Sequence, residues 1–176
     1  MQELYHTERL ELQRLRHRHA QELFDSYTSR PQVAYYMRWK AHQELEETHA
    51  FIAREVLKWE GETDYSFAMV LRSTGRSIGC ISVMTEMCKA EVGYVLGDEY
   101  WNQGLTTEAF QRLIPEIFQL PKVVRIEAIC DVENRGSSRV MEHVGMQREA
   151  VLRKYFLGAN LPDPRDVYLY SLFAEA

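Results

Sequence analysis

The chain has 176 residues, of which 45% are hydrophobic and 27% are charged, and this composition excludes a disordered or collagen-like protein. A formal net charge of -5 has the wrong sign for a protein that binds many phosphates, so we expect no nucleic-acid partner. The length predicts a single domain over residues 1–176, and the lack of a long apolar run or a signal-peptide pattern predicts a cytoplasmic protein with no membrane partner.

The first half of the chain predicts one strand and two helices. Leu10-x-Leu12 indicates the strand, and apolar residues at helical spacing over 20–27 indicate a helix that Pro31 ends. A second helix is expected over about 43–59. The aromatic segment 35–39 between these helices is either part of the core or the lining of a pocket.

A dense basic run, Arg14 to His19, lies at the predicted junction of the first strand and the first helix. Such a run is either a local site for an anion or an exposed corner, and the second is the commoner case. We therefore expect a solvated corner here.

The rest of the chain predicts further strands of a sheet and two more helices. Apolar runs at 67–71 and 78–83 flank a glycine-containing break and predict a β-hairpin, and another strand is expected over 90–97. The remaining elements expected in chain order are a helix over 104–119, a strand over 123–130, a helix over 135–144, and two late strands around the loop 158–164, the second ending in 167–173.

This order of elements predicts an α+β (α/β) fold. An antiparallel meander followed by a strand-helix-strand unit implies a mixed, mostly antiparallel sheet of about seven strands with flanking helices. Ligands of such sheets commonly bind beyond the carboxyl ends of strands, so functional residues are expected after Gly97 and after Cys130.

The segment from Tyr100 to Ala109 joins the strand at 90–97 to the long helix. The free N–H groups and the dipole at a helix start attract anions, so this turn is a candidate phosphate site. The alternative is ordinary capping of the helix by Asn102, Thr106 or Thr107, and the segment alone leaves both interpretations open.

In the strand at 90–97, side-chain alternation places Glu91, Gly93, Val95 and Gly97 on one face. The two glycines leave this face nearly bare, so a ligand can approach the backbone, and Glu91 is the one carboxylate there. Glu91 is therefore a candidate general base, with an ordinary exposed glutamate as the alternative.

Asn134 follows the strand at 123–130 and opens the next helix, where it is a natural N-cap. Asn134 and Ser137 also lie at the carboxyl end of that strand, where both can face a ligand. Capping and ligand binding both stay open for Asn134.

The cysteines and histidines predict neither disulfides nor a metal site. Cys80, Cys88 and Cys130 are an odd number without CxxC spacing, and none of the six histidines has a familiar ligand spacing to a cysteine or carboxylate. We expect no metal.

Together these segments resemble the GCN5-related N-acetyltransferase (GNAT) superfamily, in particular the branch that acetylates the α-amino groups of ribosomal proteins. The similarity runs from about Thr7 to Ser171. It is carried by Thr7-x-Arg9-Leu10-x-Leu12, Glu91-Val92-Gly93-Tyr94, Tyr100-Trp101 to Ala109, Asn134-x-x-Ser137 to Gly145, and Asp166. The resemblance implies the acyl-CoA N-acyltransferase fold and an enzyme that uses acetyl-CoA as its cosubstrate.

The resemblance also implies roles for individual residues. Glu91 would deprotonate the amine, and Ser137 would assist the departing sulfur. The amide of Val95 would bind the thioester carbonyl, and Asn134 would contact the pantetheine. The pyrophosphate would be held by backbone amides of the turn before the long helix, namely Asn102, Gln103, Gly104, Leu105, Thr106 and Thr107.

Three positions depart from the pattern of the family. Trp101 and Thr106 replace the residues that usually open and close the pyrophosphate motif, but neither change removes a backbone N–H. Met141 replaces a tyrosine that many relatives use as general acid, which leaves Ser137 as the candidate acid. Because a thiol with a pKa of about 8.5 leaves almost as a stable thiolate, weak assistance is sufficient.

The acceptor that this resemblance predicts is a primary amine, in particular the N-terminal α-amine of a ribosomal or other basic protein. An α-amine has a pKa near 7.8 and needs little help to deprotonate, and an acidic chain favours a basic partner. The acceptor would bind between the segments 35–39 and 158–164 of a monomer or homodimer. Two alternatives stay open: acetylation of a small amine (a polyamine, aminoglycoside or amino acid), and a catalytically silent acyl-CoA-binding module.

Overall fold

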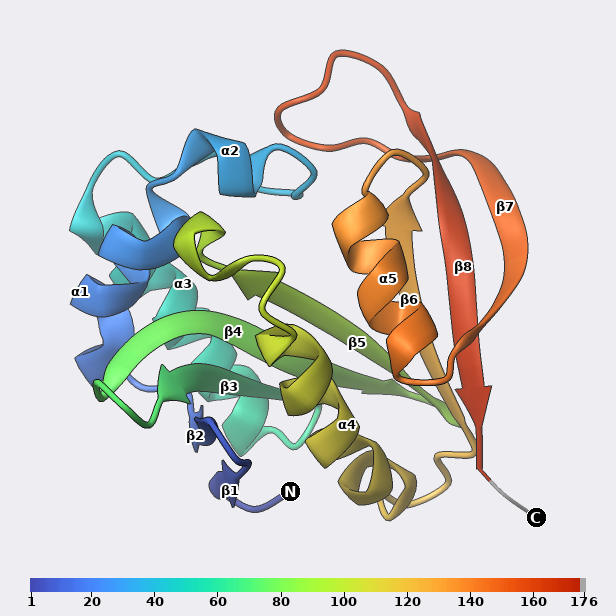
Figure 1. The fold of residues 1–176 in the computed structure, drawn as a ribbon, viewed down its shortest axis with the longest axis horizontal. Coiled ribbons are helices and arrows are strands. Elements are labelled where there is room, and N and C mark those ends of the chain that lie inside the picture. The colour runs from blue at the N-terminus through green and yellow to red at the C-terminus, as the bar shows by residue number, and fades with distance from the viewer. Residues whose placement is uncertain (175–176) are drawn as a thin grey trace.

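The computed structural model describes residues 1–174, which form a twisted mixed sheet of eight strands with helices on both faces (Figure 1). The strands lie in the order β1-β2-β3-β4-β5-β6-β8-β7, and only β5 and β6 pair in parallel. The strands are β1 (Leu4–His6), β2 (Leu10–Arg14), β3 (Asp64–Leu71), β4 (Arg76–Glu86), β5 (Lys89–Leu96), β6 (Arg125–Asp131), β7 (Gln147–Phe156) and β8 (Arg165–Phe173).

The predicted mixed, mostly antiparallel sheet is thus confirmed, with one more strand than expected. The extra strand is β1, whose three residues are too few to show an alternating pattern in the sequence. It pairs antiparallel with β2 and forms one edge of the sheet, and β7 forms the other edge.

Helices cover both faces of the sheet. The helices are α1 (Ala20–Leu23), α2 (Pro31–Ala34), α3 (Leu45–Glu60), α4 (Leu105–Phe118) and α5 (Arg135–His143), with short 3-10 turns at His17–His19 and Asp98–Tyr100. The predicted helix over 20–27 is α1 followed by a π-helical turn, Phe24–Thr28. One hydrophobic core lies between the sheet and α4 and α5, and a second lies under α1 to α3.

The strands β5 and β6 separate after a short stretch of pairing. The register joins Lys89 to Arg125, Ala90 to Ile126 and Glu91 to Glu127, and no later pair exists within residues 1–174. The two strands then diverge, with α4 beside β5 and α5 in front of β6 (Figure 1). The gap exposes the backbone of the second half of β5.

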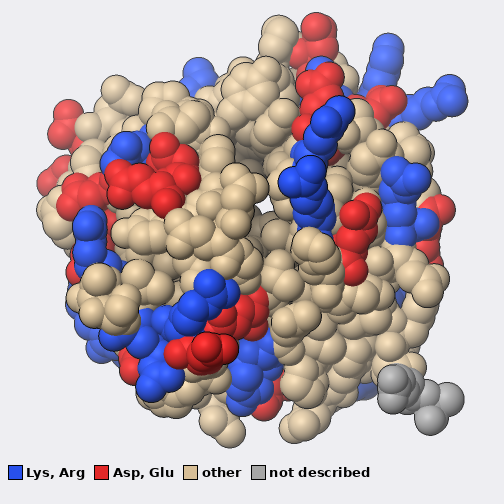
Figure 2. Space-filling view, viewed as in Figure 1, with Lys and Arg blue, Asp and Glu red and all other residues tan. Residues whose placement is uncertain are grey.

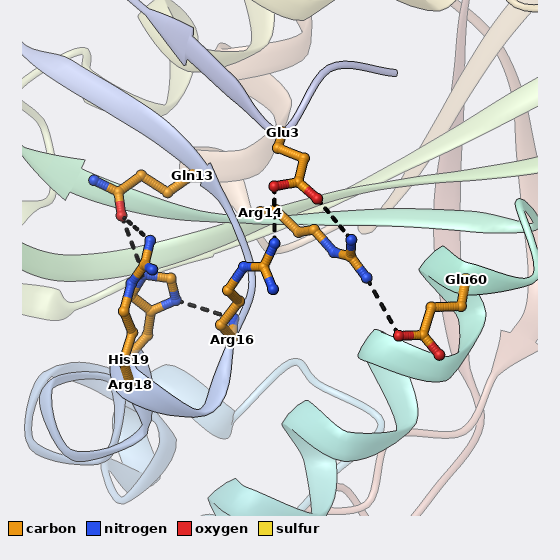
Figure 3. Close-up of polar contacts among 7 residues, drawn as sticks. All are labelled: Glu3, Gln13, Arg14, Arg16, Arg18, His19 and Glu60. Atoms are coloured by element: carbon orange, nitrogen blue, oxygen red, sulfur yellow. Dashed lines mark hydrogen bonds and ion pairs between the residues drawn. The ribbon is translucent and has the colours of Figure 1, made fainter.

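The basic run at 14–19 forms a corner between β2 and the first helical turn, and this corner is only partly solvated. The side chain of Arg14 is only 14% exposed and forms ion pairs with Glu3 and Glu60 (Figure 3). Its guanidinium also lies 5.2 Å from the ring centroid of Trp59. Arg16 also pairs with Glu3, at 2.8 Å. These contacts tie β1 to β2 and to the end of α3. The expected solvated corner is confirmed for Arg16, His17 and Arg18, which are exposed, and is wrong for Arg14 and His19, which are largely or fully buried.

His19 in the same corner is buried and is expected to make the fold sensitive to acid. Its Nδ1 accepts a hydrogen bond from the Arg16 N–H at 3.1 Å, and burial, together with the charge of Arg18, lowers its pKa from 6.5 to about 4. The unfolded chain therefore binds a proton before the folded chain does, and stability falls between pH 6.5 and 4 by on the order of 3 kcal/mol. His19→Asn should lose less stability than the parent between pH 7 and pH 4.5 in urea unfolding, and an equal loss would contradict the assignment.

Candidate functional site

A cleft of about 610 Å³ opens where β5 and β6 separate. Its walls come from the end of β5, the turn before α4, the exposed side of α5, and α2 with the segment that follows it. Figure 2 shows the corresponding hollow near the middle of the face that carries α4 and α5. The candidate site residues that line it are Val95, Asn102, Gly104, Leu105, Thr106, Thr107, Asn134 and Ser137, whereas Glu91 and Gln103 do not.

The start of α4 presents unpaired backbone donors to this cleft. Gly104, the N-cap residue, has φ of 74°, and no side chain caps the helix. The first N–H groups of a helix have no intrahelical partner, so those of Leu105, Thr106 and Thr107 are available at the wall of the cleft. The capping interpretation of this turn is therefore wrong, and the geometry of an anion site is present.

The register of β4 and β5 decides which amides of β5 face the cleft. The Gly97 N–H donates to the Ile78 carbonyl, and the ladder runs back from this pair without a bulge, with Val95 opposite Cys80. Because hydrogen-bonded pairs alternate along an antiparallel ladder, Val95 directs both its N–H and its carbonyl toward β4. The expectation that the Val95 amide faces the ligand is corrected, and the amides of Tyr94 and Leu96 point toward the gap.

Glu91 lies outside the cleft, on β5 at the last residue pair between β5 and β6, just before the two strands separate. It stands opposite Glu127, which accepts from Lys89 at 2.9 Å and from Arg125 at 2.6 Å. Although burial opposes it, these two cations lower the pKa of Glu127. Within residues 1–174 Glu91 itself forms no ion pair, so it is the carboxylate of this pair that is free to act on a ligand.

Asn134 and Ser137 lie together at the start of α5. The Asn134 Oδ1 accepts from the Ser137 N–H at 3.1 Å, so the capping interpretation of Asn134 is confirmed. Both residues also line the cleft. The amide nitrogen of Asn134 and the hydroxyl of Ser137 can therefore contact a ligand while the cap is intact.

Tyr94 bridges the cleft to Ser137. The Tyr94 Oη lies 2.8 Å from the Ser137 Oγ and 3.0 Å from the Ser137 carbonyl oxygen. Burial raises the pKa of Tyr94 well above its usual value, so the phenol stays protonated. Alternation along the strand at 90–97 puts Tyr94 on the face opposite Glu91, and nothing in that pattern shows that the Tyr94 side chain reaches Ser137. Met141, in contrast, is fully buried.

The wall formed by α5 is basic. Arg135, Arg139 and His143 recur every four residues and all line the cleft, and Figure 2 shows Lys and Arg side chains along the part of α5 that borders the hollow. Neither arginine forms an ion pair in the described part of the chain. These free cations add to the attraction of the α4 amides for an anionic ligand, and sequence reasoning did not single them out.

The segments 35–39 and 158–164 meet on the other side of the cleft. The Ala159 N–H donates to the Met37 carbonyl at 3.1 Å, and the Asn160 side chain donates to the carbonyls of Ala34 and Trp39 at 2.6 and 2.8 Å. Only the first segment lines the cleft, through Tyr36 and Met37. The loop between β7 and β8 supports that wall from behind.

Residues 1–174 contain no group of three or more His, Cys, Asp or Glu side chains arranged to hold a metal ion. No helix among them is long and apolar enough to cross a membrane.

Comparison with known proteins gives consistent matches. Residues 9–147 match the family model described as "Acetyltransferase (GNAT) domain". The chain is 32% identical to "Uncharacterized N-acetyltransferase p20" of Bacillus licheniformis, over 98% of this chain and 96% of that protein. A GNAT-family acetyltransferase from Bacillus anthracis superposes with a TM-score of 0.84 at 27% identity, over 97% and 98% of the two chains. RimL, a ribosomal L7/L12 alpha-N-protein acetyltransferase in complex with coenzyme A, superposes with a TM-score of 0.87 at 18% identity, over 97% and 98%.

Proposed function

The chain belongs to the GNAT family of acetyl-CoA-dependent N-acetyltransferases, and on this premise we propose that it acetylates the N-terminal α-amine of a basic protein or peptide. The observation that carries the proposal is the cleft between β5 and β6, with uncapped α4 amides at one end and Glu91 below it. The cleft has the donors that a pyrophosphate needs and the gap that an extended pantetheine needs.

Acetyl-CoA is the acetyl-donating substrate in this proposal. The amides of Leu105, Thr106 and Thr107 bind its pyrophosphate, and Arg135 and Arg139 add positive charge beside it. The Asn134 side chain contacts the pantetheine arm. The thioester carbonyl then accepts from an amide of β5 that faces the gap, and the register of β4 and β5 supports Tyr94 or Leu96 for this role.

Transfer proceeds by direct attack of the amine nitrogen on the thioester carbon. Glu91 takes the proton of the amine, through a water molecule because it lies below the cleft. The C–N bond forms, the C–S bond breaks, and its electron pair goes to sulfur. Free energy favours an α-amine as acceptor, since deprotonating it at pH 7 costs about 1 kcal/mol against about 4.6 kcal/mol for a lysine side chain.

Ser137 and Tyr94 assist the departing thiolate in this scheme. When Tyr94 donates to the Ser137 Oγ, the serine hydroxyl proton is free to point at the sulfur. When Tyr94 donates to the Ser137 carbonyl, the serine proton points back at the phenol. The two hydroxyls therefore form a relay that Met141 cannot supply.

Substitution of this hydroxyl pair tests the relay. Ser137→Ala and Tyr94→Phe are each expected to lower kcat by up to about 10²-fold with little change in the KM for acetyl-CoA, because a thiolate is a good leaving group. The double variant should be no slower than the slower single variant, since the two groups act as one unit. Additive losses would show that the two hydroxyls act independently and form no relay, and an unchanged rate in Ser137→Ala would show that the pair only packs the start of α5.

The acceptor is supported by charge and by structural likeness. The chain has a net charge of -5, and RimL, whose fold it shares, is named for acetylation of the α-amine of a ribosomal protein. An acidic protein attracts a basic peptide over distances up to the Debye length. A small neutral amine gains nothing from this field.

Mass spectrometry of products identifies the acceptor. Basic peptides with a free N-terminus should be acetylated on the α-amine and not on lysine, and blocking the N-terminus should abolish turnover. The kcat/KM should fall as salt rises, because screening weakens the long-range attraction. Turnover of polyamines, aminoglycosides or amino acids alone would instead assign a small-molecule acceptor, and CoA binding without any turnover would assign a silent binding module.

A further inference from the structure

We propose that Arg9 is a positioning residue for the acetyl donor, because it connects the start of β2 to the turn before α4 and holds that turn in the shape that binds pyrophosphate. The inference rests on the proposed placement of CoA at the start of α4. Arg9 belongs to the motif Thr7-x-Arg9-Leu10-x-Leu12, to which the proposed chemistry gives no role.

Arg9 makes three hydrogen bonds to a part of the chain about a hundred residues away. Its backbone N–H donates to the Glu108 Oε1 at 2.8 Å, and its Nε donates to the Glu108 Oε2 at 2.6 Å. Its Nη1 donates to the Gln103 carbonyl at 2.9 Å. One guanidinium thus binds both the turn and the first turn of α4.

The turn needs such support because its backbone is in a costly conformation. Asn102 and Gly104 both lie in the left-handed region, with φ of 58° and 74°, and the first of them is not a glycine. Gln103 lies between them. By binding the Gln103 carbonyl, Arg9 holds this oxygen away from a pyrophosphate that it would repel and fixes the direction of the neighbouring amides.

Arg9 also neutralises a carboxylate beside the anion site. Glu108 lies in the first turn of α4, where an unpaired negative charge would oppose pyrophosphate binding. Although burial opposes it, hydrogen bonds from Thr7 and Arg9 lower the pKa of Glu108, so Glu108 is charged and needs its partner. Arg9 lets the carboxylate serve as an anchor without repelling the ligand.

The fold does not depend on the contacts of Arg9 with Glu108 and Gln103, which we call the Arg9 clamp. The side chain of Arg9 is 44% exposed, and exposed ion pairs contribute little to stability. Arg72 separately anchors the same segment, since its Nη1 donates to the carbonyls of Thr7 and Glu8 at 3.0 and 3.1 Å without contact to the α4 turn. Arg72→Ala is therefore a matched control that loosens the same segment from the other side.

The test compares two acetyl donors. Acetyl-CoA carries the pyrophosphate, and acetyl-pantetheine lacks it. In Arg9→Ala the Kd for CoA and the KM for acetyl-CoA should rise about tenfold, while kcat/KM for acetyl-pantetheine stays within about twofold of the parent. Arg9→Lys should recover only part of this loss, because a point charge can pair with Glu108 but cannot hold the Gln103 carbonyl as well. Arg72→Ala should leave both donors unchanged.

Three results would overturn the inference. If Arg9→Ala binds CoA as tightly as the parent protein does, the Arg9 clamp is an ordinary surface ion pair with no effect on the donor. Equal losses with both donors, or a loss of CoA affinity in Arg72→Ala as large as in Arg9→Ala, would make it a general support of the fold. Calorimetry of CoA with the parent protein is done first, because failure of the parent to bind CoA counts against the proposed function itself.

Discussion

Glu91→Gln is expected to lower kcat/KM for an α-amine peptide by about 10²- to 10⁴-fold at neutral pH, because a carboxamide has the shape of the carboxylate but cannot accept a proton. The loss should appear in kcat, with the Kd for CoA unchanged, since Glu91 does not line the part of the cleft assigned to the donor. The pH–rate profile of the variant should lose the limb that reports the base, and its rate should rise with pH as bulk hydroxide and free amine increase.

Glu133→Gln is the matched control for this prediction. Glu133 lines the cleft directly, is 62% exposed in its side chain and pairs with the Arg165 Nη2 at 2.6 Å. A base chosen only by closeness to the cleft would be Glu133, whereas the proposed function names Glu91. A parental profile in Glu91→Gln together with a lost limb in Glu133→Gln would transfer the role to Glu133.

Hydrophobic spacing allowed most of the fold to be predicted. Leu105, Ala109, Leu113 and Ile117 recur every four residues along α4, and all four are buried against the sheet, as that spacing requires. The short strand β1 escaped prediction because its stability comes from pairing with β2 and not from a pattern of its own. Hydrophobic spacing in the sequence predicts a helix or strand only when that helix or strand buries one face at regular intervals.

In the candidate site, too, local sequence patterns predicted some features, and contacts between distant segments determine the others. Alternation predicted which side chains of β5 share a face, but the direction of the Val95 amide depends on the hydrogen-bond phase between β4 and β5, which only the pairing of two strands defines. The contacts of Tyr94 with Ser137 and of Arg9 with Glu108 also join segments far apart in the chain. Sequence reasoning found the residues of the turn and of the α5 start, and the structure found what connects them.

Gly104→Pro is expected to weaken CoA binding by about 10²-fold or more. Proline fixes φ near -65°, whereas Gly104 has φ of 74°, so the turn must rearrange and the amides that follow it move. A hydrogen bond to a charged group contributes about 1.5–3 kcal/mol, and losing two such bonds to a pyrophosphate corresponds to this loss of affinity. Calorimetric titration with CoA measures it directly.

Gly75→Pro separates the effect on the ligand from the effect on the backbone. Gly75 has φ of 71° in the β3–β4 turn, and a Cβ there meets nothing within 4 Å, so proline conflicts with this φ as it does at Gly104. Proline at position 75 also removes the hydrogen bond from the Gly75 N–H to the Leu71 carbonyl, at 2.8 Å. Gly75→Pro should lose at least as much stability as Gly104→Pro in urea unfolding, but only Gly104→Pro should lose CoA affinity, because only its turn presents amides to the cleft. Equal CoA affinity in the two folded variants would mean that the start of α4 does not hold the pyrophosphate.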